Sequence, residues 1–233
     1  FRSVWGNTER RKKLMPRLPT VGGDSGNWGT LLNQFLAIEH NADGSFIKKV
    51  VQQGDLFINV KDAAYGAVGD GNTDDTTAIQ NAINAVPSGG GTVYLPAGTY
   101  KITSGLTITA SNIAIAGAGA GATIIRAASG SEGITIFLIG DGTNTCAHTR
   151  ISDVLITSVN QKTGNSGIKL QKCFKTWLER IRVEKQYRAI HAYNSTETWL
   201  QNSDIRDTKE NGVVFESTLG SGYDFYITNV VAD

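Results

Sequence analysis

The fold is decided by a repeat that begins at residue 146, in the stretch CAHTRISDVLITSVNQKTGNSGIKLQKCFKTWLERIRV (residues 146–183). Three apolar positions of this stretch recur with the same spacing 27 residues later: Ile151, Val154 and Ile156 match Leu178, Ile181 and Val183. A repeat of this length, with apolar residues in register, indicates a solenoid in which each coil buries the face that its neighbour exposes.

A second, shorter spacing continues the pattern towards the end of the chain. The triplet Thr176-Trp177-Leu178 returns 22 residues later as Thr198-Trp199-Leu200. Residues 167–170 likewise return as residues 189–192 and 212–215. Leucine-rich repeats have a similar length, but their leucine consensus is absent. Short strands with almost no helix between them therefore predict an all-β fold, a right-handed parallel β-helix.

Composition agrees with this class and excludes several others. The 233 residues include 27 Gly and only 4 Pro, and 18% are charged, which suits short strands and many turns and disfavours coiled coils and disorder. The 22 basic and 21 acidic residues nearly cancel, so we expect no nucleic-acid partner. Nothing resembles a signal peptide or an apolar membrane span, so we expect no membrane insertion.

One helix is predicted close to the first strands. Residues 74–86 begin with Asp74, Asp75 and Thr76, whose side chains can cap the start of a helix. The two aspartates also interact favourably with the positive N-terminal end of the helix dipole, and Pro87 follows the range. The helix has one apolar stripe, made by Ile79, Ala82, Ile83 and Val86. A short helix with a single apolar face is expected to cover the end of the β-structure.

The N-terminal part is organised differently. Residues 1–24 carry an excess of basic side chains and read as an arm followed by a linker. Residues 25–40 have apolar residues at helical spacing and predict an amphipathic helix, either an attachment element or an ordinary domain helix. We assign residues 25–59 to this region and residues 60–233 to the β-helix. Because the chain starts at Phe1 and ends at Asp233 on a strand-like pattern, we expect a longer protein.

The two cysteines are 27 residues apart and each precedes a matching apolar residue by five positions. Cys146 and Cys173 should therefore lie opposite each other in adjacent coils, as reduced core thiols instead of a disulfide. Without a CxxC motif or a cluster of histidines, we expect no metal site and no cofactor.

A long stretch resembles a known family. Residues 60–85 read VKDAAYGAVGDGNTDDTTAIQNAINA and residues 89–102 read GGGTVYLPAGTYKI, and both resemble the start of the pectate-lyase-like right-handed β-helix proteins. The resemblance implies that DDTTAIQ belongs to a capping helix and that GTYKI and GATII lie in the first coils. The family includes polysaccharide lyases and hydrolases, and trimeric phage tailspikes and tail fibres.

The segment LPTVGGDSGNWGTLLNQFLAIEHNADGSF (residues 18–46) resembles a short element near the start of phage tail fibres and tailspikes. It implies a homotrimer in the virion tail, joined by its N-terminal region to other tail, baseplate or collar proteins, that recognises host surface polysaccharide. The alternative is a secreted, extracellular lyase or glycoside hydrolase with the same fold.

Glycan hydrolysis requires two carboxylates about 5 to 9.5 Å apart. Our candidate catalytic residues are Glu179, Asp204 and Asp207, because neighbouring coils could bring them together. The alternative is structural: the repeat places Arg182 beneath Asp204, and Glu184 beneath Arg206, as outward ion-pair ladders. We therefore expect depolymerase activity, if present, in the full-length protein and not in this fragment alone.

Three aromatic residues are candidates for stacking against sugars: Tyr187, Tyr193 and Trp199. The same rings could instead serve packing inside the protein or between subunits.

Overall fold

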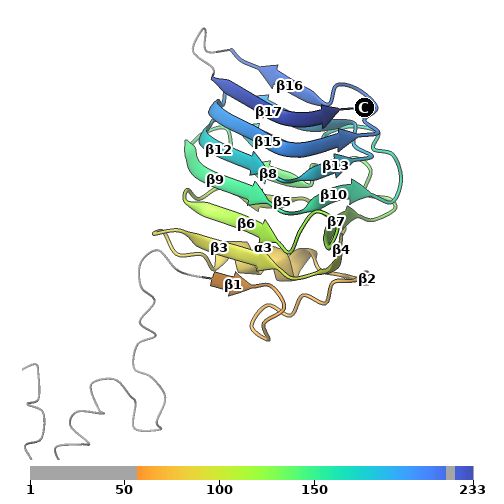
Figure 1. Ribbon diagram of the computed structural model, residues 1–233. Helices are drawn as coiled ribbons and strands as arrows, with labels where there is room; N and C mark the ends of the chain where they lie inside the picture. Colours follow the sequence, from red (N-terminus) through yellow and green to blue (C-terminus); the bar gives the residue numbers. More distant parts are fainter. Residues whose placement is uncertain (1–56, 219–223, 233) are drawn as a thin grey trace, which may run out of the picture. The chain divides into compact units, whose positions relative to one another are not determined.

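A computed structural model of the chain describes residues 57–218 and 224–232. These residues form parallel strands stacked in successive coils, with one helix beside the first coils (Figure 1). The predicted parallel β-helix is confirmed. The predicted basic arm at 1–24 and the predicted helix at 25–40 lie outside the described residues. The first described strand begins at Phe57, within the range 25–59 predicted for the N-terminal region.

Each coil presents three faces. The first face contains β1 (Phe57–Asn59), β3 (Gly91–Leu95), β6 (Ile113–Gly117), β9 (Cys146–Ser152), β12 (Cys173–Glu179) and the first half of β15 (Thr196–Arg206). The second face contains β2 (Asp70–Asp74), β4 (Gly98–Ile102), β7 (Thr123–Ala127), β10 (Leu155–Ser158), β13 (Arg182–Glu184) and the second half of β15. The third face contains β5 (Leu106–Ile108), β8 (Phe137–Ile139), β11 (Ser166–Gln171), β14 (Arg188–Tyr193) and β16 (Val213–Glu216).

The strand β17 (Phe225–Ala232) pairs with both halves of β15 and completes the stack as far as the structure describes it. The register agrees with the repeats in the sequence. Leu178 pairs with Ile151 and Leu200, and Val183 pairs with Ile156 and Ile205. Pairs of residues 22 or 27 positions apart therefore lie one above the other in neighbouring coils.

The core lies inside the coils and is built by alternation along each strand. In β4, for example, Tyr100 and Ile102 are fully buried, while Lys101 between them is half-buried. Alternating burial of this kind is what a strand with one face on a core requires. Every coil adds apolar residues to one continuous core cluster.

The predicted capping helix is α3 (Thr76–Asn84), shorter at both ends than the predicted range. Ile79, Ala82 and Ile83 are buried, which confirms the apolar stripe. One detail of the prediction is wrong: Asp75 makes no side-chain capping bond. Its buried carboxylate instead accepts the backbone N–H groups of Val68 at 2.7 Å and Gly69 at 3.0 Å, so it fixes the preceding loop.

The corners between faces are made by left-handed residues that repeat from coil to coil. Asp153, Arg180, Asn202 and Asn229 all have a positive φ, between 50° and 62°. They are separated by 27, 22 and 27 residues, the spacings of the coils themselves. The chain therefore turns at the same point in each coil, and the side chains of these corners are stacked.

The two cysteines occupy adjacent coils as predicted. Cys173 pairs with Cys146 in the register of β9 and β12, and both thiols are free and buried. The hydrogen bond shared with Cys146, together with burial, raises the pKa of the Cys173 thiol. Close packing holds this region: a Cβ added to Gly140, which has a φ of +79°, would lie 2.0 Å from the Gln171 carbonyl oxygen.

Candidate functional site

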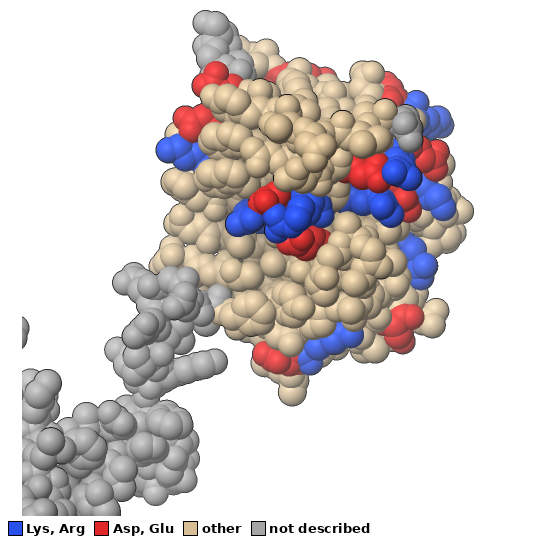
Figure 2. Space-filling view, viewed as in Figure 1, with Lys and Arg blue, Asp and Glu red and all other residues tan. Residues whose placement is uncertain are grey.

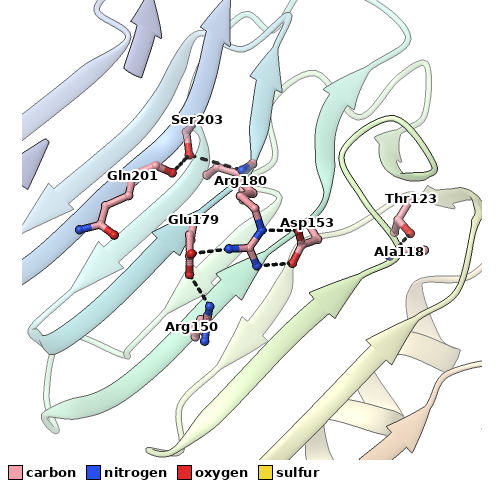
Figure 3. Close-up of polar contacts among 9 residues, drawn as sticks. Ala118, Thr123, Arg150, Asp153, Glu179, Arg180, Gln201 and Ser203 are labelled. Carbon is pink, nitrogen blue, oxygen red and sulfur yellow. Dashed lines mark hydrogen bonds and ion pairs between the residues drawn. The ribbon is translucent and has the colours of Figure 1, made fainter. Parts of the chain in front are cut away.

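Glu179 is the first of the predicted site residues and lies at the end of β12, on the outside of the first face. Its two carboxylate oxygens accept hydrogen bonds from two guanidinium groups, those of Arg150 and Arg180. Arg180 also donates to Asp153 in the coil below, from Nε to Oδ1 at 2.7 Å and from Nη2 to Oδ2 at 2.8 Å (Figure 3). Four charges therefore form one neutral network.

The electrostatics of this network favour the ionised form of Asp153. The guanidinium of Arg180 donates to Asp153 and lowers the pKa of that carboxyl group below its ordinary value. Arg180 itself has a raised pKa because Asp153 accepts from it. A network that keeps Asp153 ionised and binds all four carboxylate oxygens of Asp153 and Glu179 is suited to joining coils.

Asp204 lies in the second half of β15, beyond the corner at Asn202. Its Oδ2 accepts from Nε of Arg182 at 3.1 Å, and its Oδ1 accepts from Nε of Arg206 at 2.7 Å. The predicted pairing of Arg182 with Asp204 is confirmed. Glu184 is in register with Arg206, and its side chain also accepts a hydrogen bond from the Thr157 hydroxyl at 3.3 Å.

Asp207 directly follows β15, at an exposed corner residue with a φ of 50°. Its backbone carbonyl accepts from the Gln161 side chain at 3.0 Å. The three candidate residues lie in three different rows of stacked side chains. Glu179 shares its row with Gln201, Asp204 shares its row with Arg182, and Asp207 belongs to a corner.

Charged side chains gather in clusters on a surface that is otherwise largely uncharged (Figure 2). In this view a group of Lys, Arg, Asp and Glu side chains lies near the middle of the face, and further charged side chains lie towards one edge. Most of the surface between them carries no charge, so local groups must supply any specificity for a ligand.

An aromatic ladder runs along the outside of the first face. Trp177 and Trp199 stack at 4.9 Å between ring centroids with an interplanar angle of 7°. Tyr226 stacks on Trp199 at 5.4 Å, and His148 lies 6.3 Å from Trp177 on the other side. Because both faces of Trp199 are covered by its neighbours, this ring offers a sugar only its edge. The contacts of Trp199 with Trp177 and Tyr226 fit the alternative role, packing inside the protein.

The two tyrosines among the predicted platforms differ from each other. The Tyr187 hydroxyl donates to Oε1 of Glu210 at 3.1 Å, and Oε2 of Glu210 accepts from Arg188 at 2.6 Å. Tyr193 lies on the outside of the third face, half-buried, in register with Gln171 and Glu216. Its hydroxyl has no hydrogen-bond partner within the described part of the chain.

One polar pair on the third face could not be predicted from the sequence. Nε2 of His191 lies 3.1 Å from Oε2 of Glu216, and the His191 side chain is buried. The two residues are 25 positions apart, because one coil of 23 residues separates their strands and the pair is diagonal within it. The shorter repeat spacing could have placed His191 over Lys169, but not beside Glu216.

No group of three or more His, Cys, Asp or Glu side chains suited to a metal ion occurs among residues 57–218 and 224–232. The only helix in these same ranges is α3, and its nine residues are too few to cross a bilayer. A shallow cavity of about 120 Å³ lies at the last described coil, and Ala192, Phe215 and Phe225 are among its lining residues.

The chain is similar to several known proteins in sequence or in structure. The chain is 54% identical over 80 residues to mannuronan C5-epimerase AlgE3 of Azotobacter vinelandii, a match that covers 31% of this chain and 4% of that protein. The structure resembles ORF18 of Geobacillus virus E2 with a TM-score of 0.56 and 25% identity, over 75% of this chain and 41% of that one.

A third similarity concerns the fold alone. Tailspike protein 3 of bacteriophage CBA120 matches with a TM-score of 0.57 and 14% identity, over 76% of this chain and 28% of that one. The chain thus spans less than half the length of each of these three proteins.

A family model described as rhamnogalacturonase A/epimerase, pectate lyase-like matches residues 57–233. With the stacked parallel coils, this match establishes that the chain belongs to the pectate lyase-like rhamnogalacturonase A/epimerase family.

Proposed function

We propose that the chain is part of a phage tailspike or tail fibre, a structural and adhesive virion protein that recognises host surface polysaccharide. The observation that carries this proposal is the similarity to ORF18 of Geobacillus virus E2 over three quarters of the chain. The fold shared with the CBA120 tailspike protein is consistent with it.

The charged groups of the β-helix favour adhesion over cleavage in this part of the protein. Both oxygens of Glu179 and both oxygens of Asp204 are occupied by guanidinium groups. A general acid or base needs a free oxygen within reach of the substrate. These carboxylates instead join neighbouring coils through ion pairs.

Under this proposal the parts of the chain have different roles. Residues 25–59 attach the protein to other tail, baseplate or collar proteins. Residues 60–233 form the β-helix that faces the host, and three copies of the chain assemble. The protein belongs to the virion tail.

Light scattering coupled to size-exclusion chromatography tests the assembly. The expected mass is three times that of one chain, unchanged on dilution through the micromolar range. A stable monomer would count against the tailspike and favour the secreted enzyme. Binding of the labelled protein to host cells, competed by their purified polysaccharide, then tests recognition.

A second candidate function is a secreted, extracellular lyase, hydrolase or related polysaccharide-modifying enzyme. The observation in its favour is the 54% identity to mannuronan C5-epimerase AlgE3 over 80 residues. Incubation with polymannuronate separates the two candidates. The enzyme hypothesis expects changed uronate residues or unsaturated products, measured by NMR spectroscopy, whereas the adhesive protein leaves the polymer unchanged.

A further inference from the structure

We propose that Cys146 and Cys173 are a redox-sensitive pair, which a small disulfide such as oxidised glutathione converts into a covalent link between two adjacent coils. Both residues lie in the core and not on an outer surface that would recognise a glycan. The inference therefore goes beyond the proposed function, and its chemistry does not depend on that function.

The strand register holds the two cysteines one above the other. Cys146 begins β9, Cys173 begins β12, and the two residues are directly paired. Paired residues of neighbouring strands lie about 4.8 Å apart, and the Cα atoms of disulfide-linked cysteines lie about 4.4 to 6.8 Å apart. The backbone therefore needs no large movement to bring the two sulfur atoms together.

The two side chains also point the same way. Sγ of Cys146 lies 4.0 Å from the carbonyl oxygen of Ile108. Sγ of Cys173 lies 3.1 Å from the carbonyl oxygen of Ile139. Ile108 and Ile139 are themselves paired in β5 and β8, so the sulfur atoms face the same end of the third face in successive coils. A Cβ added to Gly140 would lie 3.3 Å from Sγ of Cys173, so the sulfur atoms have little room to move apart.

The two thiols are not equivalent in reactivity. Cys146 directly follows residues 141–145, which are exposed and lie outside the strands, so local opening of this loop admits a small oxidant. The hydrogen bond shared with Cys173 lowers the pKa of the Cys146 thiol to about 7. The thiolate is the nucleophile in disulfide exchange, so Cys146 is the residue that attacks first.

The exchange has two steps. The Cys146 thiolate attacks one sulfur of oxidised glutathione, the S–S bond of glutathione breaks, and one glutathione leaves and takes up the proton that Cys146 released. Cys173 then attacks the Cys146 sulfur of the mixed disulfide, and the second glutathione leaves with the proton of Cys173. The two cysteines lose two electrons and two protons, and the oxidant becomes two glutathione thiols.

The link stabilises the fold because it closes a loop in the unfolded chain, between positions 27 residues apart, and so lowers the entropy of the unfolded state. Both candidate functions place the mature protein outside a cell, where disulfides persist, whereas thiols stay reduced in the cytosol during synthesis. The coils therefore form with free thiols, and oxidation after release joins the two coils covalently.

The experiment is equilibration of the folded chain in buffers of reduced and oxidised glutathione, followed by transfer into denaturant with excess N-ethylmaleimide and intact mass spectrometry. The reduced chain takes up maleimide on both thiols, and the oxidised chain is expected to take up none. Proteolysis should then give one pair of peptides linked through Cys146 and Cys173. The same equilibration of the unfolded chain in denaturant is the reference, and we expect the link to be favoured about tenfold or more in the folded chain.

Cys146→Ser and Cys173→Ser are the matched controls, and each should keep one thiol that forms no intramolecular link. Circular dichroism verifies that these variants are folded, and the result for the wild type stands without them. The inference is overturned if both wild-type thiols stay reduced, if a mixed disulfide with glutathione is the final product, if the link joins two chains, or if it forms as readily in the unfolded chain. None of these outcomes bears on trimer assembly or adhesion to host cells, which test the proposed function separately.

Discussion

Arg180 lies one coil above Asp153 and donates to both oxygens of its carboxylate, at 2.7 Å and 2.8 Å. The two residues occupy the same left-handed corner in successive coils, with φ values of 50° and 62°. A conformation that is unusual for both residues is thus coupled to an ion pair that only this stacking permits. The ion pair therefore links the turn of one coil to the turn of the next coil.

This relationship predicts the effect of Asp153→Asn. Asparagine is nearly isosteric and tolerates the left-handed conformation, so the substitution removes charge without straining the turn. Since both partners are partly exposed, we expect a loss of about 1 kcal/mol in the free energy of unfolding at neutral pH. Urea denaturation measures it, and Asp207→Asn, at an exposed corner, is the matched control with little change expected.

The loss of stability caused by Asp153→Asn depends on pH. The pKa of Asp153 is lowered in the folded state, so its stabilisation is present above the pKa of the unfolded chain and is lost as pH falls through the folded pKa. The difference between wild type and Asp153→Asn should therefore shrink on acidification below about pH 4. A difference that grows in acid would contradict the assignment.

A buried lysine leads to a prediction about stability at alkaline pH. Lys162 is fully buried, its Nζ donates to the carbonyl oxygens of Ser131 at 2.7 Å and Ile134 at 3.0 Å, and burial lowers its pKa to about 8. Between that value and the ordinary lysine pKa, the unfolded chain binds more protons than the folded one. Stability contributed by this group therefore rises with pH through this window, by at most about 3 kcal/mol.

Lys162→Met should remove this rise, whereas Lys185→Met, at an exposed corner, should keep it. Urea denaturation at a series of pH values from neutral to about pH 10.5 measures the difference between each variant and the wild type. Parallel curves for Lys162→Met and wild type would show that the ammonium group is not responsible.

The aromatic ladder predicts a graded loss of stability. Trp199 stacks on both neighbours, Trp177 and Tyr226, whereas Tyr226 stacks on Trp199 and is 45% exposed. We expect Trp199→Ala to cost about 2 to 3 kcal/mol and Tyr226→Ala clearly less. Equal losses in chemical denaturation would mean that stacking is not the source of the effect.

The coils were predictable because their register depends on apolar residues that must stack. The spacings of 27 and 22 residues place Leu178 over Ile151 and beneath Leu200, as the structure has them. The side-chain partners were less predictable. Asp75 precedes a helix and so resembles a cap, but whether its carboxylate turns to the helix or to the Val68 loop depends on tertiary packing. The His191 and Glu216 contact is diagonal, and no repeat encodes it.

The final prediction concerns catalysis by the chain itself, which should release few or no reducing ends from capsule or lipopolysaccharide. Hydrolysis needs one carboxyl to protonate the leaving oxygen and a second to act as base or nucleophile. Glu179 and Asp204 each have both oxygens bound by guanidinium groups, and they lie on opposite sides of a corner. A reducing-end assay should therefore give the same background for the wild type, Glu179→Gln, Asp204→Asn and Asp207→Asn. Release that Asp204→Asn abolishes, with the variant still folded, would show that these carboxylates act in catalysis and that their ion pairs open when a glycan binds.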